Sequence, residues 1–170
     1  MKYASIDVGT NTVLLLVVHV NRDVRDILDI STITRLGQGL RQSGFLSAIA
    51  MERAYTALKR YKDIIRAHGI ENIHCVGTSA LREAGNSREF LTRVREELGI
   101  PIKIISERKE AYYTYLSVKY DELIQGKRFV IVDIGGGSTE IIKGTPREFV
   151  DWISVPAGAV KLTEMFIRHD

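Results

Sequence analysis

Short apolar runs rich in β-branched residues open the chain. Tyr3–Ile6 and Val13–Val20 are two such runs, and the segment between them contains Asp7 and Gly9. Runs of this length and composition, separated by turn residues, are typical of two strands of a β-hairpin. Val24–Leu36 continues with apolar residues among polar ones and predicts a third strand at the edge of the sheet. The chain is therefore expected to begin with an antiparallel meander.

After Ser47 the apolar residues recur every three or four positions, which predicts one long amphipathic helix. Ser47 is a suitable N-cap, and Gly69 a suitable end. Further strands are predicted at Ile73–Val76, Ile102–Ile105, Phe129–Val132, Ile141–Ile142 and Phe149–Val155, and further helices at Ser79–Ala84, Ser87–Leu98 (capped by Asn86 or Ser87), Glu107–Leu123 and Gly158–Arg168. A meander followed by β-α units indicates a mixed sheet with helices packed on it.

Composition narrows the class of protein without selecting a function. The chain has 170 residues, 45% hydrophobic and 26% charged, with a formal net charge of +3. These values are typical of one soluble globular domain and exclude a disordered or collagen-like chain. The single cysteine, Cys75, excludes an intramolecular disulfide, so a reducing, cytoplasmic location is expected. The longest apolar run, Val13–Val18, is too short to span a bilayer, and no basic run suggests a nucleic-acid partner.

Two glycine-containing turns repeat one pattern far apart in the chain. Asp7–Thr12 and Asp133–Glu140 each combine an Asp, an apolar residue and glycine with hydroxyl or amide side chains, between two strands. Glycine permits a tight turn whose N–H groups point at an anion, and the Asp carboxylate can bind a divalent cation beside that anion. One such turn alone is as readily an ordinary hairpin, but two with matching Asp residues favour phosphate binding. The residues expected to bind phosphate are Gly9, Thr10, Asn11, Thr12, Gly135, Gly136, Gly137 and Ser138.

The common helix-terminal phosphate motifs are absent from the sequence. Gly39 and Gly44 have the spacing of a P-loop, but Phe45 stands where that motif needs Lys. A Rossmann fingerprint opens into a helix, whereas the glycines before Ile141 open into a predicted strand.

Two charged side chains at predicted helix starts are further candidates. Arg82 follows the Ile73–Val76 strand and is able to meet a phosphate, although a surface pair with Glu83 or Glu89 is the commoner arrangement. Glu110 follows the strand Ile102–Ile105, at the sheet edge where α/β proteins place active sites. Glu110 is suited to accept a proton from water, but an acidic residue in a first helical turn more often serves the helix dipole.

Four blocks of the sequence together carry a family resemblance. Residues 6–12 (IDVGTNT), 77–86 (GTSALREAGN), 105–111 (ISERKEA) and 133–140 (DIGGGSTE) resemble, in order and spacing, the exopolyphosphatase/guanosine pentaphosphate phosphohydrolase family. The resemblance covers essentially the whole chain. It implies an α/β, ribonuclease H-like (actin-like ATPase) fold, with a mixed five-stranded sheet flanked by helices, in one lobe of a two-lobe enzyme. Residues 1–170 are then expected to be the single N-terminal lobe, with the second lobe absent from this chain.

The resemblance also implies a reaction and residue roles. The reaction is hydrolysis of the terminal phosphoanhydride bond of inorganic polyphosphate or of guanosine pentaphosphate, assisted by Mg²⁺ or a similar cation. Glu110 corresponds to the general base, Asp133 and Glu140 to catalytic and metal-binding residues, Asp7 to a further metal ligand, and Arg82 to an arginine that contacts the polyanion. A homodimer is expected for the full-length protein.

One position departs from the family pattern. Lys109 stands where members often carry Glu, so its charge either depresses the pKa of Glu110 or points away from it. Two alternatives to the hydrolase stay open: an actin-like ATPase or sugar-kinase relative, and a catalytically silent phosphate-binding lobe. The hydrolase interpretation requires the two glycine turns to converge on one chain of phosphates.

Overall fold

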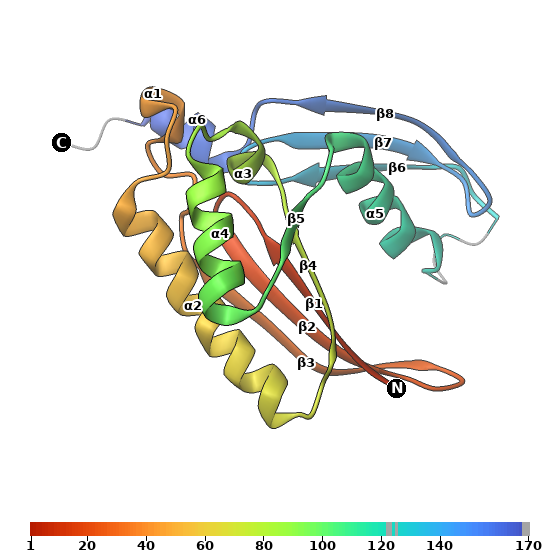
Figure 1. Cartoon of the computed structure of the whole chain (residues 1–170). Helices are drawn as coiled ribbons and strands as arrows, with labels where there is room; N and C mark the ends of the chain where they lie inside the picture. Colours follow the sequence, from red (N-terminus) through yellow and green to blue (C-terminus); the bar gives the residue numbers. More distant parts are fainter. Residues whose placement is uncertain (122–123, 125, 168–170) are drawn as a thin grey trace. The chain divides into compact units, whose positions relative to one another are not determined.

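The computed structural model describes residues 1–121, 124 and 126–167, and it divides into two compact units, Met1–Ile104 and Ile105–Asp170. Figure 1 shows the elements of both units in sequence colours. The strands after Ile105 pair with one another and not with the first sheet. The predicted ends of two helices, Leu123 and Arg168, lie outside the described residues.

The first unit contains a mixed five-stranded sheet, as predicted, in the order β3-β2-β1-β4-β5. Its strands are β1 (Lys2–Val8), β2 (Thr12–Val20), β3 (Val24–Ile33), β4 (Asn72–Gly77) and β5 (Ile102–Ile104). β1, β2 and β3 form the expected antiparallel meander, with β3 at the edge, while β4 runs parallel to β1 and β5 parallel to β4. The C-terminal ends of β1 and β4 therefore meet at one edge of the sheet.

Three of the helices described in the first unit were predicted, and the short α1 (Leu40–Ser43) was not. The predicted ones are α2 (Ala48–Ala67), α3 (Ser79–Glu83) and α4 (Ser87–Leu98). α2 begins where its cap was expected, since the Ser47 hydroxyl accepts a hydrogen bond from the Ala50 amide at 3.2 Å. In Figure 1, α2 and α4 lie side by side over one face of the sheet.

Alternation along the strands supplies the core beneath these helices. Ala4, Ile6 and Val8 of β1 are buried, and so are Leu58 and Tyr61 of α2. Burying side chains of this kind contributes about 1.5–3 kcal/mol each for the larger apolar ones. The Tyr61 hydroxyl stays satisfied in the core because it donates to the Val13 carbonyl at 2.9 Å.

The predicted capping role of Asn86 is wrong. Asn86 does occupy the N-cap position of α4, but its side chain makes no capping hydrogen bond. Its amide group instead pairs with the backbone of Leu46, accepting from the N–H at 2.8 Å and donating to the carbonyl at 3.0 Å. The side chain thereby fixes the chain segment that leads into α2, a contact across 40 residues.

The second unit consists of a three-stranded antiparallel sheet and two helices. The strands are β6 (Phe129–Ile134), β7 (Thr139–Gly144) and β8 (Phe149–Val155), and the helices are α5 (Glu107–Lys119) and α6 (Ala159–Phe166). α5 packs on one face of the sheet, where Ala111, Tyr115 and Ile142 form a small buried core. Trp152 packs against this cluster, as expected for a core residue of its strand. None of the helices in the described ranges is long and apolar enough to cross a membrane.

Candidate phosphate-binding turns and active-site residues

The first glycine turn connects β1 to β2. The Gly9 amide donates to the Thr12 carbonyl at 3.0 Å, which closes the turn two residues after Asp7. A Cβ atom on Gly9 would lie 2.9 Å from the Thr12 carbonyl oxygen, so the turn requires glycine there. The backbone amides of Thr10 and Asn11 donate no hydrogen bond within the part of the chain that the structure describes. These two N–H groups are available to an anion.

The second glycine turn, between β6 and β7, has the same hydrogen bond. The Gly135 amide donates to the Ser138 carbonyl at 2.9 Å, again two residues after an aspartate, Asp133. The next two amides, those of Gly136 and Gly137, likewise donate to no group among the described residues. The sequence repeat is therefore a repeat of backbone conformation.

A later glycine, which none of the sequence motifs includes, packs against each turn. In the first unit, the Gly37 amide donates to the Thr10 carbonyl at 2.8 Å. In the second, Gly158 lies so close to Gly136 that a Cβ atom would contact the Gly136 backbone at less than 3.0 Å. The Val160 amide, in the first turn of α6, then donates to the Gly136 carbonyl at 2.9 Å. One signal was present in the sequence: both glycines follow the third strand of their meander.

Arg82 belongs to the same sheet edge as the first turn. Val8 of β1 is the ladder partner of Gly77 of β4, and the Thr78 amide donates to the Val8 carbonyl at 3.3 Å. α3, which contains Arg82, begins directly after Thr78. The first unit thus brings Asp7, the Gly9–Thr12 turn and the helix of Arg82 to one edge.

A row of polar side chains crosses the sheet of the second unit. Asp133, Glu140 and Ser154 are successive ladder partners on β6, β7 and β8, so their side chains share one face. Glu140 is only 2% exposed, and its carboxylate accepts a hydrogen bond from the Ser154 hydroxyl at 2.8 Å. The Asp133 carboxylate accepts from the Thr114 hydroxyl of α5 at 2.8 Å. This contact identifies the row as lying on the α5 side of the sheet.

Glu110 lies on the helix face that reaches this row. It precedes Thr114 by four residues on α5, and residues with this spacing are neighbours on one face of a helix. Its side chain is half-buried. Lys109 points elsewhere, since its ammonium lies 5.4 Å from the centroid of the Tyr113 ring, which is exposed. This contact favours the interpretation in which the lysine does not face the carboxylate.

The acidic residues suit a hard divalent cation that also binds phosphate. Asp133 and Glu140 offer carboxylate oxygens from facing ladder positions, and Mg²⁺ is commonly held by one or two carboxylates together with waters and substrate phosphates. Within the described residues, no group of three or more His, Cys, Asp or Glu side chains is arranged to hold a metal unaided. These carboxylate oxygens fit Mg²⁺ when phosphate oxygens and waters supply the rest of its coordination shell.

Cys75 lies close enough to Asp7 to sense its charge. It is buried in β4, and burial, reinforced by the negative charge of Asp7, raises the pKa of its thiol. A thiol held neutral in this way is a poor nucleophile and a poor metal ligand. Cys75 is thus a small buried residue of its strand.

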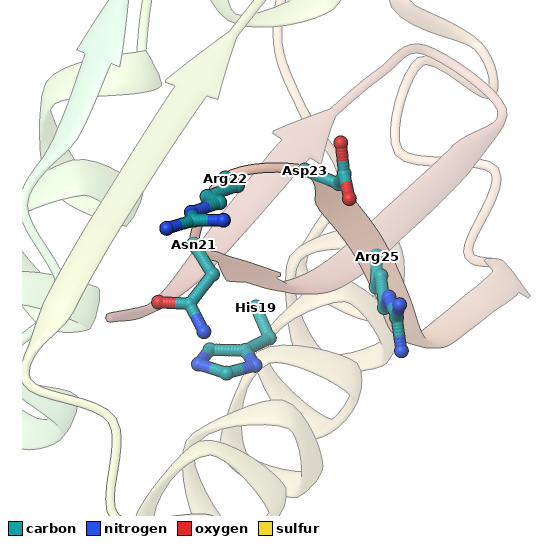
Figure 2. Close-up of a pocket in the computed structure, with 5 residues that line it drawn as sticks. All are labelled: His19, Asn21, Arg22, Asp23 and Arg25. Carbon is teal, nitrogen blue, oxygen red and sulfur yellow. The ribbon is translucent and has the colours of Figure 1, made fainter.

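A charged cavity of about 390 Å³ lies elsewhere in the first unit, at the β2–β3 turn. Figure 2 shows its lining residues, His19, Asn21, Arg22, Asp23 and Arg25. β2 runs from Thr12 to Val20, so this cavity lies at the opposite end of that strand from the glycine turn. At about 3.3 Å per residue the separation is more than 20 Å, which excludes the cavity from the candidate site.

Comparison with solved structures first defines the class of fold. The ethanolamine utilization protein EutJ from Carboxydothermus hydrogenoformans aligns with 96% of this chain at a TM-score of 0.59 and 17% identity, a likeness of fold alone. An exopolyphosphatase from Cytophaga hutchinsonii aligns with 100% of this chain and 55% of its own, at a TM-score of 0.94 and 30% identity. The α/β chain with its mixed five-stranded sheet has the ribonuclease H-like, actin-like ATPase fold, as expected.

Sequence comparison then gives the family. The model of the Ppx/GppA phosphatase family matches residues 16–170. The Ppx/GppA family member from Aquifex aeolicus is 37% identical and aligns with 100% of this chain and 56% of its own, at a TM-score of 0.83. The guanosine-5'-triphosphate,3'-diphosphate pyrophosphatase of Vibrio cholerae is 38% identical, over 98% of this chain and 33% of that protein. The chain belongs to the Ppx/GppA phosphatase family.

The match is partial in length. The chain spans about a third of the Vibrio cholerae protein, and 26% of a bifunctional 3-dehydroquinate synthase/phosphatase of Fusobacterium nucleatum to which it is 37% identical. Family membership supports a phosphohydrolase in general terms.

Proposed function

We propose that the intact protein hydrolyses the terminal phosphoanhydride bond of inorganic polyphosphate or of guanosine pentaphosphate. The observation that carries the proposal is the repeated turn: two aspartates are each followed by a glycine turn with two available amides. The names of the relatives, an exopolyphosphatase and a guanosine-5'-triphosphate,3'-diphosphate pyrophosphatase, support the same substrate class. Both substrates carry a terminal phosphoryl group joined through a phosphoanhydride bond.

In this proposal each of the two turns binds phosphate through its backbone amides. The amides of Thr10 and Asn11 in one turn, and of Gly136 and Gly137 in the other, donate to phosphoryl oxygens. The Thr12 and Ser138 hydroxyls add donors, and the Arg82 guanidinium neutralises part of the polyanion's charge. Phosphoryl transfer depends chiefly on such positioning and electrostatic stabilisation, because the transition state spreads charge over the phosphoryl oxygens.

Glu110 is the proposed general base. It takes a proton from the water that attacks the terminal phosphorus, and the shortened phosphate chain leaves with the bridging oxygen. Asp7, Asp133 and Glu140 are the residues proposed to hold Mg²⁺ or a similar cation, which would neutralise charge on the phosphoryl oxygens. The hydrogen bonds from Thr114 and Ser154 support this role, because they orient the carboxylates of Asp133 and Glu140.

Replacing the base tests the proposal. Glu110→Gln keeps the size of the side chain and removes its basicity, so kcat for phosphate release from long-chain polyphosphate is expected to fall by about 10²–10⁴-fold. The matched control is Glu107→Gln, which changes another carboxylate in the first turn of α5 and is expected to leave kcat within about twofold. Equal rates for Glu110→Gln and the unmodified protein would show that the base is wrongly assigned.

A double-mutant cycle tests whether the two turns serve one substrate. Asp7→Asn and Asp133→Asn are each expected to lower kcat/KM by at least about tenfold. If both carboxylates act on one bound metal–phosphate complex, the double variant loses less than the product of the single losses, since interacting residues are not additive. Strict multiplication of the two effects would argue for two independent sites.

The catalytically silent lobe is the second candidate, and the partial length of the match favours it for the 170-residue chain taken alone. An anion that is bound from one side only stays solvated on the other side, which weakens its binding and leaves the site open to water. We expect this chain to bind polyphosphate weakly and to hydrolyse it much more slowly than a longer family member. Tight ATP binding without phosphate release from polyphosphate would instead indicate the ATPase or sugar-kinase alternative.

Location and assembly belong to the same proposal. A cytoplasmic protein fits the single buried cysteine, because thiols stay reduced in that compartment. A homodimer of the intact protein is proposed as well, and light scattering after gel filtration measures it directly.

A further inference from the structure

A cavity of about 510 Å³ lies in the second unit, beside the first two turns of α5. The residues that line it are Ser106, Arg108, Lys109, Tyr112 and Phe149. Its volume falls within the range of roughly 300–1,000 Å³ that is usual for small-molecule sites. None of these residues has a part in the proposed hydrolysis.

The cavity and the candidate active-site residues lie on different faces of α5. Arg108 and Tyr112 are four residues apart and share one face of the helix. Glu110 and Thr114 form another face, which reaches Asp133. Two residues along a helix correspond to a rotation of about 200°, so the two pairs lie on nearly opposite sides of α5.

Aromatic rings form one wall of the cavity. The Tyr112 ring stands at 89° to the Phe149 ring, with their centroids 5.7 Å apart. The ring of Tyr115, buried in the core, packs against both. Its centroid lies 6.1 Å from that of Tyr112 and 5.5 Å from that of Phe149. Tyr112 is nevertheless 42% exposed. The core therefore fixes the ring in place and leaves part of its surface open to a flat ligand, which would stack on it.

Positive charge forms the other wall. Neither Arg108 nor Lys109 makes a salt bridge within the described ranges, and no carboxylate is found among the lining residues. Two cations that line the cavity without a lining carboxylate favour an anionic ligand. Polyphosphate alone would leave the ring surface unused, and an apolar ligand would leave both cations without an anion.

We propose that this cavity binds a purine nucleotide, with the base against Tyr112 and Phe149 and the phosphates against Arg108 and Lys109. The site is separate from the proposed hydrolytic site, so either proposal can fail without the other. A purine is preferred to a pyrimidine because its larger ring system offers more surface for stacking.

Calorimetric titration of the intact protein with GTP, ATP, guanosine and tripolyphosphate tests this site. The Glu110→Gln background prevents hydrolysis during the titration. Tyr112→Leu is expected to weaken GTP and ATP binding by about tenfold or more, the usual loss for one base–aromatic stack, and to leave tripolyphosphate binding unchanged. Arg108→Gln is expected to weaken nucleotide binding too, whereas Tyr112→Phe retains it because the ring is kept.

Tyr113→Leu is the matched control. Tyr113 is an equally exposed tyrosine on the same helix, 43% exposed against 42% for Tyr112, but it does not line the cavity. Because the Tyr113 ring contacts the Lys109 ammonium, 5.4 Å from the ring centroid, but does not itself line the cavity, Tyr113→Leu is expected to weaken GTP binding by no more than about twofold. Absence of nucleotide binding, or equal losses for Tyr112→Leu and Tyr113→Leu, would overturn the proposal.

Photolabelling gives a second readout that needs no variant. Irradiation of the unmodified protein with 8-azido-GTP is expected to label the α5 peptide that contains Tyr112, or the β8 peptide that contains Phe149. Labelling confined to peptides of the first unit would refute the site even if Tyr112→Leu does not fold.

Discussion

The two units share one motif and differ in what surrounds it. Each contains a three-stranded antiparallel meander whose first turn follows an aspartate and is closed by a glycine amide, at 3.0 Å in the first unit and 2.9 Å in the second. In the second unit the meander follows α5. In the first unit, β4 pairs with the outer side of β1 and helices cover one face of the sheet. In the second, β6 is an edge strand of a sheet of three. The conformation of the glycine turn thus needs only its own residues and one supporting segment.

Burial differs much more than the turns do. The first unit has an extended core, whereas the second has the small cluster of Ala111, Tyr115 and Ile142. Apolar side chains on the face away from α5 are solvent-exposed, among them Val132 at 57% and Ile153 at 54%. Because apolar burial supplies most of the favourable free energy of folding, the second unit is expected to open more easily than the first.

The largest effect is expected from truncating a buried side chain in each unit, which tests whether the two units open independently. Leu58→Ala in the first unit is expected to cost about 2–5 kcal/mol of unfolding free energy, since Leu58 is fully buried. Hydrogen exchange should show reduced protection in β1 and β2 and unchanged protection in β7. Ile142→Ala should give the reverse pattern. If either substitution lowers protection throughout the chain, the two units fold as one cooperative body.

Adding a methyl group behind each turn tests how the turns are supported. Gly158→Ala forces a Cβ atom against the Gly136 backbone and is expected to cost about 3 kcal/mol, because backbone cannot move aside. Gly37→Ala places its Cβ against only the Thr10 methyl group, so about 1–2 kcal/mol is expected. Thr10→Ser removes that methyl group and should restore the stability of Gly37→Ala in urea unfolding. Failure of this rescue would show that the first turn is also held by backbone.

A smaller effect is expected from the buried acid of the second unit. Ser154→Ala removes the hydroxyl that donates to the Glu140 carboxylate, which costs about 1–3 kcal/mol when the acceptor is buried. Thr114→Val removes the donor to the half-buried Asp133 and is expected to cost less, because water can replace it. The fluorescence of Trp152, the only tryptophan, reports unfolding of this unit. Equal losses of unfolding free energy for the two variants would show that the burial of Glu140 does not increase the cost of removing its hydrogen-bond donor.

The weakest expected effect concerns Cys75 at alkaline pH. Burial raises the pKa of its thiol, so the folded state keeps the proton at a pH where the unfolded chain, whose thiol has an ordinary pKa near 9.0, loses it. Stability is therefore expected to fall as the pH rises above 9.0, by at most about 1.4 kcal/mol per pH unit. Cys75→Ala removes this contribution, so its unfolding free energy should depend less steeply on pH between about 9 and 10.5. Identical slopes for the two proteins would contradict the assignment.

The local elements were predictable because their signals lie within a few residues. Ser47 caps α2 as its position indicates, and the period of apolar residues places α2 and α4 within one or two residues of their bounds. The glycine turns were also predictable, since the pattern of Asp and Gly fixes the backbone over four residues. The family followed from four such local blocks, each readable without knowledge of the packing.

The contacts that assemble the candidate site were not predictable, because they join residues distant in the chain. Thr114 reaches Asp133 across 19 residues, and Asn86 binds the backbone of Leu46 across 40 instead of capping its own helix. No local pattern specifies which distant group a hydroxyl or an amide will meet, since that depends on how the layers pack. The close approach of Gly158 to Gly136 is of the same kind.

The sequence by itself determined most of the strands and helices, the two glycine turns and the family of this protein. Only the tertiary structure decided that the chain forms two units, that Glu140 is buried beside Ser154, and that one face of α5 meets Asp133 while the opposite face meets Phe149. The physical reason is the distance along the chain over which each kind of interaction acts. Propensity, capping and turn geometry act over a few residues, whereas burial and side-chain pairing are properties of surfaces that exist only after the layers have packed.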